Sequence, residues 1–148
     1  MSDQSMEWKR DNFTITTDKI RFDVAVIHGF LTTSYWAKGI PLETVERSIE
    51  HSMGFAVLDG EAQVGFARVM TDRTTFAYIG DVFILPAARG HGLGKWLMET
   101  MLAHPELQGL RTWTLFTADA HGLYEQYGFQ VYPTPHKFMT FSTFDGYG

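Results

Sequence analysis

The chain has 148 residues, a hydrophobic fraction of 45% and a formal net charge of −5, and we expect one domain over residues 1–148. Because it contains no cysteine, a disulfide framework, a cysteine nucleophile and a thiolate metal site are excluded. The acidic balance argues against nucleic acid as a partner, since such proteins usually carry a basic face. No apolar run is long enough for a membrane span, and the polar residues 1–10 lack the apolar core of a signal peptide, so we expect a cytoplasmic protein without membrane contact.

In the first half of the chain, the spacing of apolar residues predicts both strands and helices. Asp59-Gly60 is a hairpin signal between two apolar runs, and Pro41 suits the first turn of a helix. The elements expected in this half are a strand at 13–16, helices at 22–31 and 41–52, and strands at 53–58, 63–70 and 75–85.

The second half of the chain predicts a crossover from one strand through a helix to another. The expected elements are a helix at 92–103, a strand at 110–117, a short helix at 118–127 and a final pair of strands at 129–132 and 137–141. Helices at the front, an antiparallel meander and one crossover indicate an α+β protein with a mixed, mostly antiparallel sheet. We expect six or seven strands and about four helices.

The segment Asp81–Lys95, DVFILPAARGHGLGK, is the most informative part of the chain. An apolar run suited to a buried strand is followed by Pro86, three glycines at alternate positions and the start of a helix. This order directs backbone N–H groups and the positive end of a helix dipole at one spot, which favours phosphate. The alternative is a plain glycine turn between a strand and a helix.

Two familiar phosphate loops do not fit this segment. The NTPase loop requires Ser or Thr after Gly-Lys, but Gly94-Lys95 is followed by Trp96. The dinucleotide pattern G-x-G-x-x-G, begun at Gly90, would need its third glycine at Lys95. What remains is Arg89-x-x-Gly92-x-Gly94 after a strand.

This pattern resembles the acyl-CoA pyrophosphate loop of the GNAT superfamily of N-acetyltransferases, Gln/Arg-x-x-Gly-x-Gly/Ala. A second motif lies downstream, in the sequence TADAHGLYEQYGFQ that begins at Thr117. It resembles Asn-x-x-Ala-x-x-x-Tyr-x-x-x-Gly-Phe of the same family, with Thr117 in place of the usual Asn. The matching positions of this second motif are Ala120, Tyr124, Gly128 and Phe129.

The resemblance implies a three-layer α/β/α-like fold whose sheet is splayed between the strands at 76–85 and 110–117. It also implies acetyl-CoA as co-substrate, held by the loop and by a strand edge that pairs with the pantetheine arm. Arg89 would bind phosphate or hold the loop's shape, and Lys95 would reach a phosphate or remain in solvent. The cofactor-binding residues implied are Val82, Phe83, Ile84, Arg89, Gly90, His91, Gly92, Leu93, Gly94, Lys95, Thr117 and Tyr124.

The family's acyl transfer needs help with two proton transfers, one off the attacking amine and one onto the thiolate. Tyr124 matches the family's general-acid tyrosine; the plainer reading is a core aromatic. Asp81 is the candidate base, with a structural carboxylate and a water chain as alternatives. For the acceptor pocket the candidates are Phe30, Tyr35 and Trp36, which could equally be core or lid residues.

The function implied is transfer of an acetyl group from acetyl-CoA to a primary amine of a small molecule or protein, by direct attack in a ternary complex. The alternatives are a non-catalytic acyl-CoA-binding sensor and an acetyltransferase acting on aminoacyl-tRNA. No metal site is expected, because the six histidines are scattered without ligand spacing. A homodimer stays open, since the aromatic residues after 137 suit either sheet core or an interface.

Overall fold

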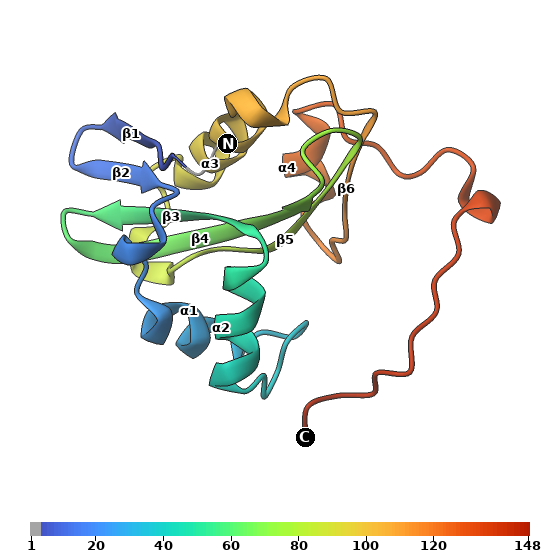
Figure 1. Ribbon diagram of the computed structural model, residues 1–148, viewed down its shortest axis with the longest axis horizontal. Helices are drawn as coiled ribbons and strands as arrows, with labels where there is room; N and C mark the ends of the chain where they lie inside the picture. Colours follow the sequence, from blue (N-terminus) through green and yellow to red (C-terminus); the bar gives the residue numbers. More distant parts are fainter. Residues whose placement is uncertain (1–3) are drawn as a thin grey trace.

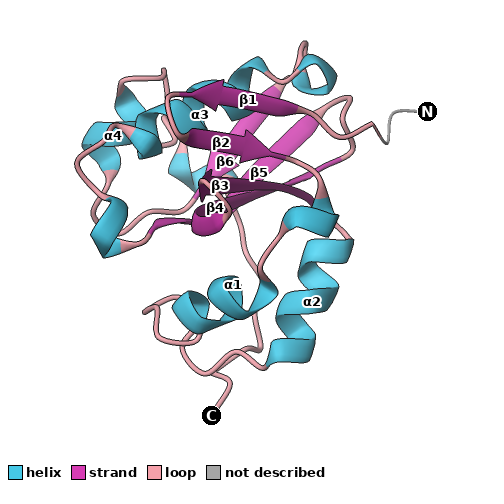
Figure 2. Cartoon of the chain, turned by 90° about the vertical axis from the view of Figure 1, so that its left-hand side faces the viewer, coloured by secondary structure: helices cyan, strands magenta, loops and turns pink. Residues whose placement is uncertain are grey.

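The computed structural model describes residues 4–148 and consists of a six-stranded sheet with helices on both faces (Figures 1 and 2). The sheet order follows the chain, β1-β2-β3-β4-β5-β6, and every neighbouring pair is antiparallel except β5 and β6, which are parallel. The mixed, mostly antiparallel α+β fold is therefore confirmed. The strands are β1 (Glu7–Arg10), β2 (Phe13–Thr16), β3 (Met53–Asp59), β4 (Ala62–Thr71), β5 (Phe76–Ile84) and β6 (Thr112–Leu115).

Four α-helices are divided between the two faces, α1 and α2 on one and α3 and α4 on the other (Figures 1 and 2). Short 3₁₀ turns join several elements. The α-helices are α1 (Val24–Leu31), α2 (Leu42–Glu50), α3 (Leu93–Ala103) and α4 (His121–Glu125), and the 3₁₀ turns are η1 (Lys19–Arg21), η2 (Pro86–Ala88), η3 (Pro105–Leu107) and η4 (Pro135–Lys137). None of the helices formed by residues 4–148 has the length and apolar character of a membrane span.

Two buried clusters, one on each face, hold the layers together. Alternation along β3 sends Phe55 and Val57 to the α3 side and Ala56 and Leu58 to the α1–α2 side. Each fully buried large apolar side chain contributes roughly 1.5–3 kcal/mol relative to exposure. The apolar residues at helical spacing in α1, α2 and α3 are thus the ones that face the core.

β5 and β6 pair over four positions and then diverge. The parallel pairing runs from Phe76↔Thr112 to Ile79↔Leu115, whereas β5 itself continues to Ile84. Beyond Ile79, β5 has no strand partner on that side among residues 4–148. This is the splay expected between these two strands, and it leaves one strand edge open.

The predicted final strands at 129–132 and 137–141 are wrong, because that part of the chain forms no strand. Pro133 and Pro135 lack an N–H and restrict the backbone there, and η4 occupies Pro135–Lys137. The chain leaves α4 as an extended, largely exposed segment (Figure 1). The sheet still has six strands because residues 7–16 form a hairpin, β1 and β2, where one strand was expected.

Candidate functional site

A hollow of about 470 Å³ opens where β5 and β6 diverge, and we call it the β5–β6 hollow. Its walls come from the loop after α1, from β4 and β5, and from the segment joining β6 to α4. The lining residues are Tyr35, Trp36, Arg68, Tyr78, Ile79, Gly80, Asp81, Val82, Leu115, Phe116, Thr117, Ala118, Asp119, Ala120 and Tyr124. Six of the predicted site residues therefore share one space, namely Tyr35, Trp36, Asp81, Val82, Thr117 and Tyr124, whereas Phe30, Phe83, Ile84 and residues 89–95 do not line it.

The glycine-rich loop between η2 and α3 has the shape that its sequence predicts. Gly90 and Gly92 have φ of +89° and +71°, a region that disfavours side chains. Apart from the adjacent residues and the helix's own backbone, no described atom lies within 4 Å of a Cβ built at either residue or at Gly94, so there is room for a ligand beside the loop. Gly92 also caps α3, whose first intrahelical bond joins Trp96 N to Gly92 O at 3.1 Å.

The side chains around this loop have different tasks. Arg89 Nε donates to the carbonyl of Ile84 at 3.0 Å, which ties the loop to the end of β5 and supports the loop-shaping alternative. Leu93 is buried and anchors the loop in the core, so only its backbone is available to a ligand. His91 lies against Phe13, with ring centroids 5.5 Å apart, and Lys95 is exposed.

Tyr124 is the buried phenol of the β5–β6 hollow. It lies on α4 and is 8% exposed. Burial raises the pKa of Tyr124 above its usual value of 10.0, and Tyr35 and Asp119 raise it further. The phenol therefore keeps its proton at neutral pH. Thr117 Oγ1 accepts a bond from Ala120 N at 2.9 Å, so the residue that replaces the family's Asn fixes the start of α4.

Asp81 is held by two partners inside the same hollow. Its Oδ2 accepts from Arg68 Nε at 2.6 Å and its Oδ1 accepts from Trp36 Nε1 at 2.9 Å. The side chains of Asp81 and Arg68 are 12% and 18% exposed. With both carboxylate oxygens engaged, the structural-carboxylate reading gains support, and the role of Asp81 as base stays a prediction.

The backbone at Asp81 is unusual as well. Its φ of +56° is uncommon for a residue other than glycine, and it lies where the register between β4 and β5 shifts, between Phe66 and Arg68. Bulges of this kind aim a side chain in a direction that regular pairing would not allow. Strain maintained at such a position is typical of functional sites.

Two of the three predicted acceptor residues line the β5–β6 hollow, and the third packs behind them. Tyr35 and Trp36 line the β5–β6 hollow and are 68% and 40% exposed. Phe30 does not line it; its ring stacks on Phe83 at 4.2 Å between centroids and lies 6.2 Å from Trp36. The side chain of Phe83 is itself buried on the α1–α2 face. Only the backbone of Phe83 is therefore available to a cofactor bound along β5.

Sequence reasoning missed several residues of the hollow, of which Tyr78 and Phe116 are the largest. Their rings are 5.8 Å apart, edge to face, across the β5–β6 gap. Tyr78 shares a strand face with Gly80 by simple alternation, a usable signal, but the bulge at Asp81 ends that alternation, and Val82 packs with the cluster on the α3 side that contains Ile79. Burial raises the pKa of Tyr78, with Asp81 adding to the effect.

Comparison with known proteins identifies a family. The sequence model of the protein family described as "Acetyltransferase (GNAT) domain" matches residues 50–131 of this chain. A crystal structure of a protein from Xanthomonas campestris pv. campestris, described as belonging to the GNAT family of acetyltransferases, is 47% identical, with a TM-score of 0.87 over 88% of this chain and 93% of that one.

Two further similar proteins have names that mention a ligand or an acceptor. An acetyltransferase structure with acetyl-CoA from Clostridium acetobutylicum has the same fold, with a TM-score of 0.62 and 11% identity over 94% of this chain and 95% of that one. Serotonin N-acetyltransferase 2 from Oryza sativa subsp. japonica is 30% identical over 67% of this chain. The match spans only 52% of that rice protein.

Proposed function

Because the chain belongs to the GNAT family of acetyltransferases, we propose that it transfers an acetyl group from acetyl-CoA to a primary amine by direct attack in a ternary complex. The observation that carries this proposal is the convergence of an open strand edge, a glycine-rich helix start and a buried phenol. Direct transfer is favoured because the chain has no cysteine to carry an acyl group.

The described residues fit acetyl-CoA in two respects. Gly90 and Gly92 present backbone at a place where no Cβ intrudes, which suits close approach of a pyrophosphate. The unpaired edge of β5 after Ile79 can accept an extended arm as an added strand. We assign the pyrophosphate to residues 89–95 and the pantetheine arm to 82–84. When bound, acetyl-CoA supplies an activated thioester carbonyl.

We assign the acid role to Tyr124. A phenol that keeps its proton across the neutral range can hydrogen-bond to a leaving thiolate and protonate it. Thr117 supports this role by fixing the start of the helix that carries Tyr124. For the proton that leaves the attacking amine we keep two acceptors, Asp81 and a water chain: each Asp81 oxygen accepts one bond, from Arg68 or Trp36, and retains a further lone pair.

The acceptor side combines aromatic surface with carboxylates. Tyr35, Trp36, Tyr78 and Phe116 line the hollow together with Asp119, and aromatic faces attract a cationic amine. We therefore propose an amine on an apolar or aromatic body as the acceptor. The rice relative's name refers to serotonin, an aromatic amine, which supports placing such amines among the first tested.

The test is amine-dependent release of free thiol from acetyl-CoA, across aromatic amines, polyamines and a lysine-containing peptide. Tyr124→Phe should lower kcat roughly 100-fold or more while leaving acetyl-CoA affinity nearly unchanged. Tyr132→Phe, an exposed phenol outside the hollow, is the matched control. Equal kcat in wild type and Tyr124→Phe would remove the acid assignment. Tight acetyl-CoA binding with no thiol release for any amine would instead indicate the non-catalytic binding module.

A further inference from the structure

The chain after η4 carries large apolar side chains that remain exposed to solvent, and we call residues 138–148 the C-terminal segment. Within residues 4–148, no hydrogen bond joins residues 139–148 to another element. Apolar side chains that are exposed together mark a binding surface more often than chance allows. Those of the C-terminal segment are Phe138, Met139, Phe141, Phe144 and Tyr147.

The C-terminal segment begins on one wall of the β5–β6 hollow. The ring of Phe138 packs edge to face on the ring of Phe116, with centroids 6.2 Å apart. Phe116 lines the hollow and packs edge to face on Tyr78 at 5.8 Å. A series of aromatic rings therefore runs from the inside of the hollow to the first residue of the C-terminal segment.

The other end of the C-terminal segment lies beside a second wall of the same hollow. The Cβ of Tyr147 is 3.6 Å from a Cβ built on Gly39. Gly39 belongs to the loop between α1 and α2, which also contains Tyr35 and Trp36, two residues that line the hollow. Figure 1 shows the chain passing from the α4 side of the sheet to the α1–α2 side. The C-terminal segment thus connects two walls of the hollow.

We propose that the C-terminal segment closes as a strap over the β5–β6 hollow when an amine is bound, and that Met139 and Phe141 cover the apolar body of that amine. The proposal rests on the acetyl transfer proposed above. Met139 and Phe141 are 89% and 92% exposed and lie between the two contacts with the walls. Since residues 139–148 have no hydrogen bond to another described element, this part can move without breaking one. Closure would remove apolar surface from water on both the protein and the amine.

The positions of the two ends favour the hollow of the same chain over a second copy as the partner of the C-terminal segment. Phe138 and Tyr147 already contact residues of this chain, and both contacts are with segments that line one hollow. A segment exchanged into a second copy would give up both contacts. An acceptor that fills the space between the walls requires neither to break.

One engineered disulfide tests where the C-terminal segment lies. The chain has no cysteine, so Gly39→Cys with Tyr147→Cys introduces the only two thiols. Their Cβ separation of 3.6 Å suits a disulfide, and oxidation should give an intrachain bond at the mass of a monomer. A disulfide-linked dimer would assign the segment to a second copy, and the absence of any bond in the folded variant would show that it does not lie beside Gly39. Either result overturns the proposal.

A kinetic test leaves Gly39 unchanged, because its φ of +79° disfavours any side chain. In the double variant Met139→Ser with Phe141→Ser, the ratio of kcat/KM for tryptamine to kcat/KM for ethylamine should fall roughly tenfold, through KM. Ethylamine is too short to reach the strap. An unchanged ratio would overturn the proposal.

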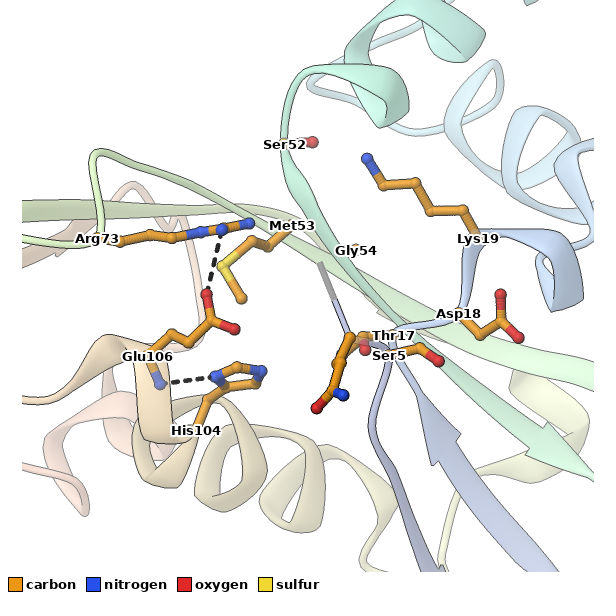
Figure 3. Close-up of a pocket in the computed structure, with 11 residues that line it drawn as sticks. Ser5, Thr17, Asp18, Lys19, Ser52, Met53, Gly54, Arg73, His104 and Glu106 are labelled. Atoms are coloured by element: carbon orange, nitrogen blue, oxygen red, sulfur yellow. Dashed lines mark hydrogen bonds and ion pairs between the residues drawn. The ribbon is translucent and has the colours of Figure 1, made fainter. Parts of the chain in front are cut away.

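Ile20→Ser is the matched control for this kinetic test. Ile20 is 93% exposed, and it follows Asp18 and Lys19, which line a separate hollow of about 350 Å³ (Figure 3). That hollow shares no residue with the β5–β6 hollow. The ratio for the two amines should therefore be the same in Ile20→Ser as in wild type, and an equal fall in both variants would overturn the proposal.

Binding can also be observed without turnover, which separates the strap from the acetyl-transfer assignment. With 4-fluorophenylalanine at position 141 and CoA in place of acetyl-CoA, no acetyl group is present. Tryptamine should shift the ¹⁹F resonance saturably, whereas ethylamine should not. No shift up to tens of millimolar tryptamine would overturn the strap. A saturable shift in a protein that acetylates no amine would support the strap and remove the acetyl-transfer assignment.

Discussion

Gly92→Ala tests the glycine-rich loop most directly, because the structure offers a matched control. Gly92 has a φ of +71° and Gly109, between η3 and β6, has a φ of +78°. A Cβ built at either residue meets no described atom within 4 Å. The two substitutions therefore impose the same conformational cost without a steric clash in the free protein, and only one of them lies in the proposed phosphate loop.

The magnitudes follow from this geometry. An alanine held in the left-handed region costs roughly 1–2 kcal/mol, so both variants should lose about that much stability, or about 2–4 °C in Tm for each kcal/mol. At Gly92 the new methyl group also enters the space that a pyrophosphate would occupy. We expect acetyl-CoA affinity to fall at least tenfold there, which corresponds to about 1.4 kcal/mol, and to stay unchanged in Gly109→Ala.

The assay is thermal unfolding of each variant together with calorimetric titration of acetyl-CoA. Comparable losses of stability with a binding defect confined to Gly92→Ala would support the loop assignment. If Gly92→Ala binds acetyl-CoA as wild type does, the loop does not hold the pyrophosphate. If both variants lose affinity equally, the loss reflects stability and not contact with the ligand.

Two further predictions concern the β5–β6 hollow. Trp36→Phe keeps an aromatic ring but removes the hydrogen bond that Trp36 donates to Asp81, which is worth about 1 kcal/mol. In steady-state kinetics the KM for the amine should therefore rise several-fold, while the KM for acetyl-CoA should not change. A rise in the KM for acetyl-CoA alone would contradict the acceptor assignment. Burial raises the pKa of Tyr124 above 10.0, so the folded protein binds this proton more tightly than the unfolded chain. That stability is complete below about pH 10 and is lost as pH rises through the folded-state pKa. In urea unfolding, wild type should therefore lose more stability above pH 10 than Tyr124→Phe, and parallel curves would show that the phenol is not perturbed.

Much of the fold could be predicted because its signals are local. Helical spacing in residues 24–31 and 93–103, the turn at Asp59-Gly60 and the apolar, β-branched run at the end of β5 each depend on neighbouring residues. The final strands could not be predicted in the same way. Segment 137–141 has the composition of a strand, but a strand needs a partner, and pairing is a property of the whole molecule.

The site shows the same division. The glycines of the loop and Tyr124 could be named as candidates because their spacing carries information. The bonds from Arg68 and Trp36 to Asp81 were not found, since they join three segments far apart in the chain and depend on a bulge that gives Asp81 its φ of +56°. No one of these residues stands out by type alone.

The open edge of β5 has a consequence for the protein in solution. Unpaired N–H and C=O groups along a strand invite other chains to add to the sheet, which is a route to aggregation. Here the edge from Gly80 to Ile84 has no strand partner among residues 4–148. An extended molecule bound along it would close the sheet, so we expect bound acetyl-CoA to lower the tendency of this protein to aggregate.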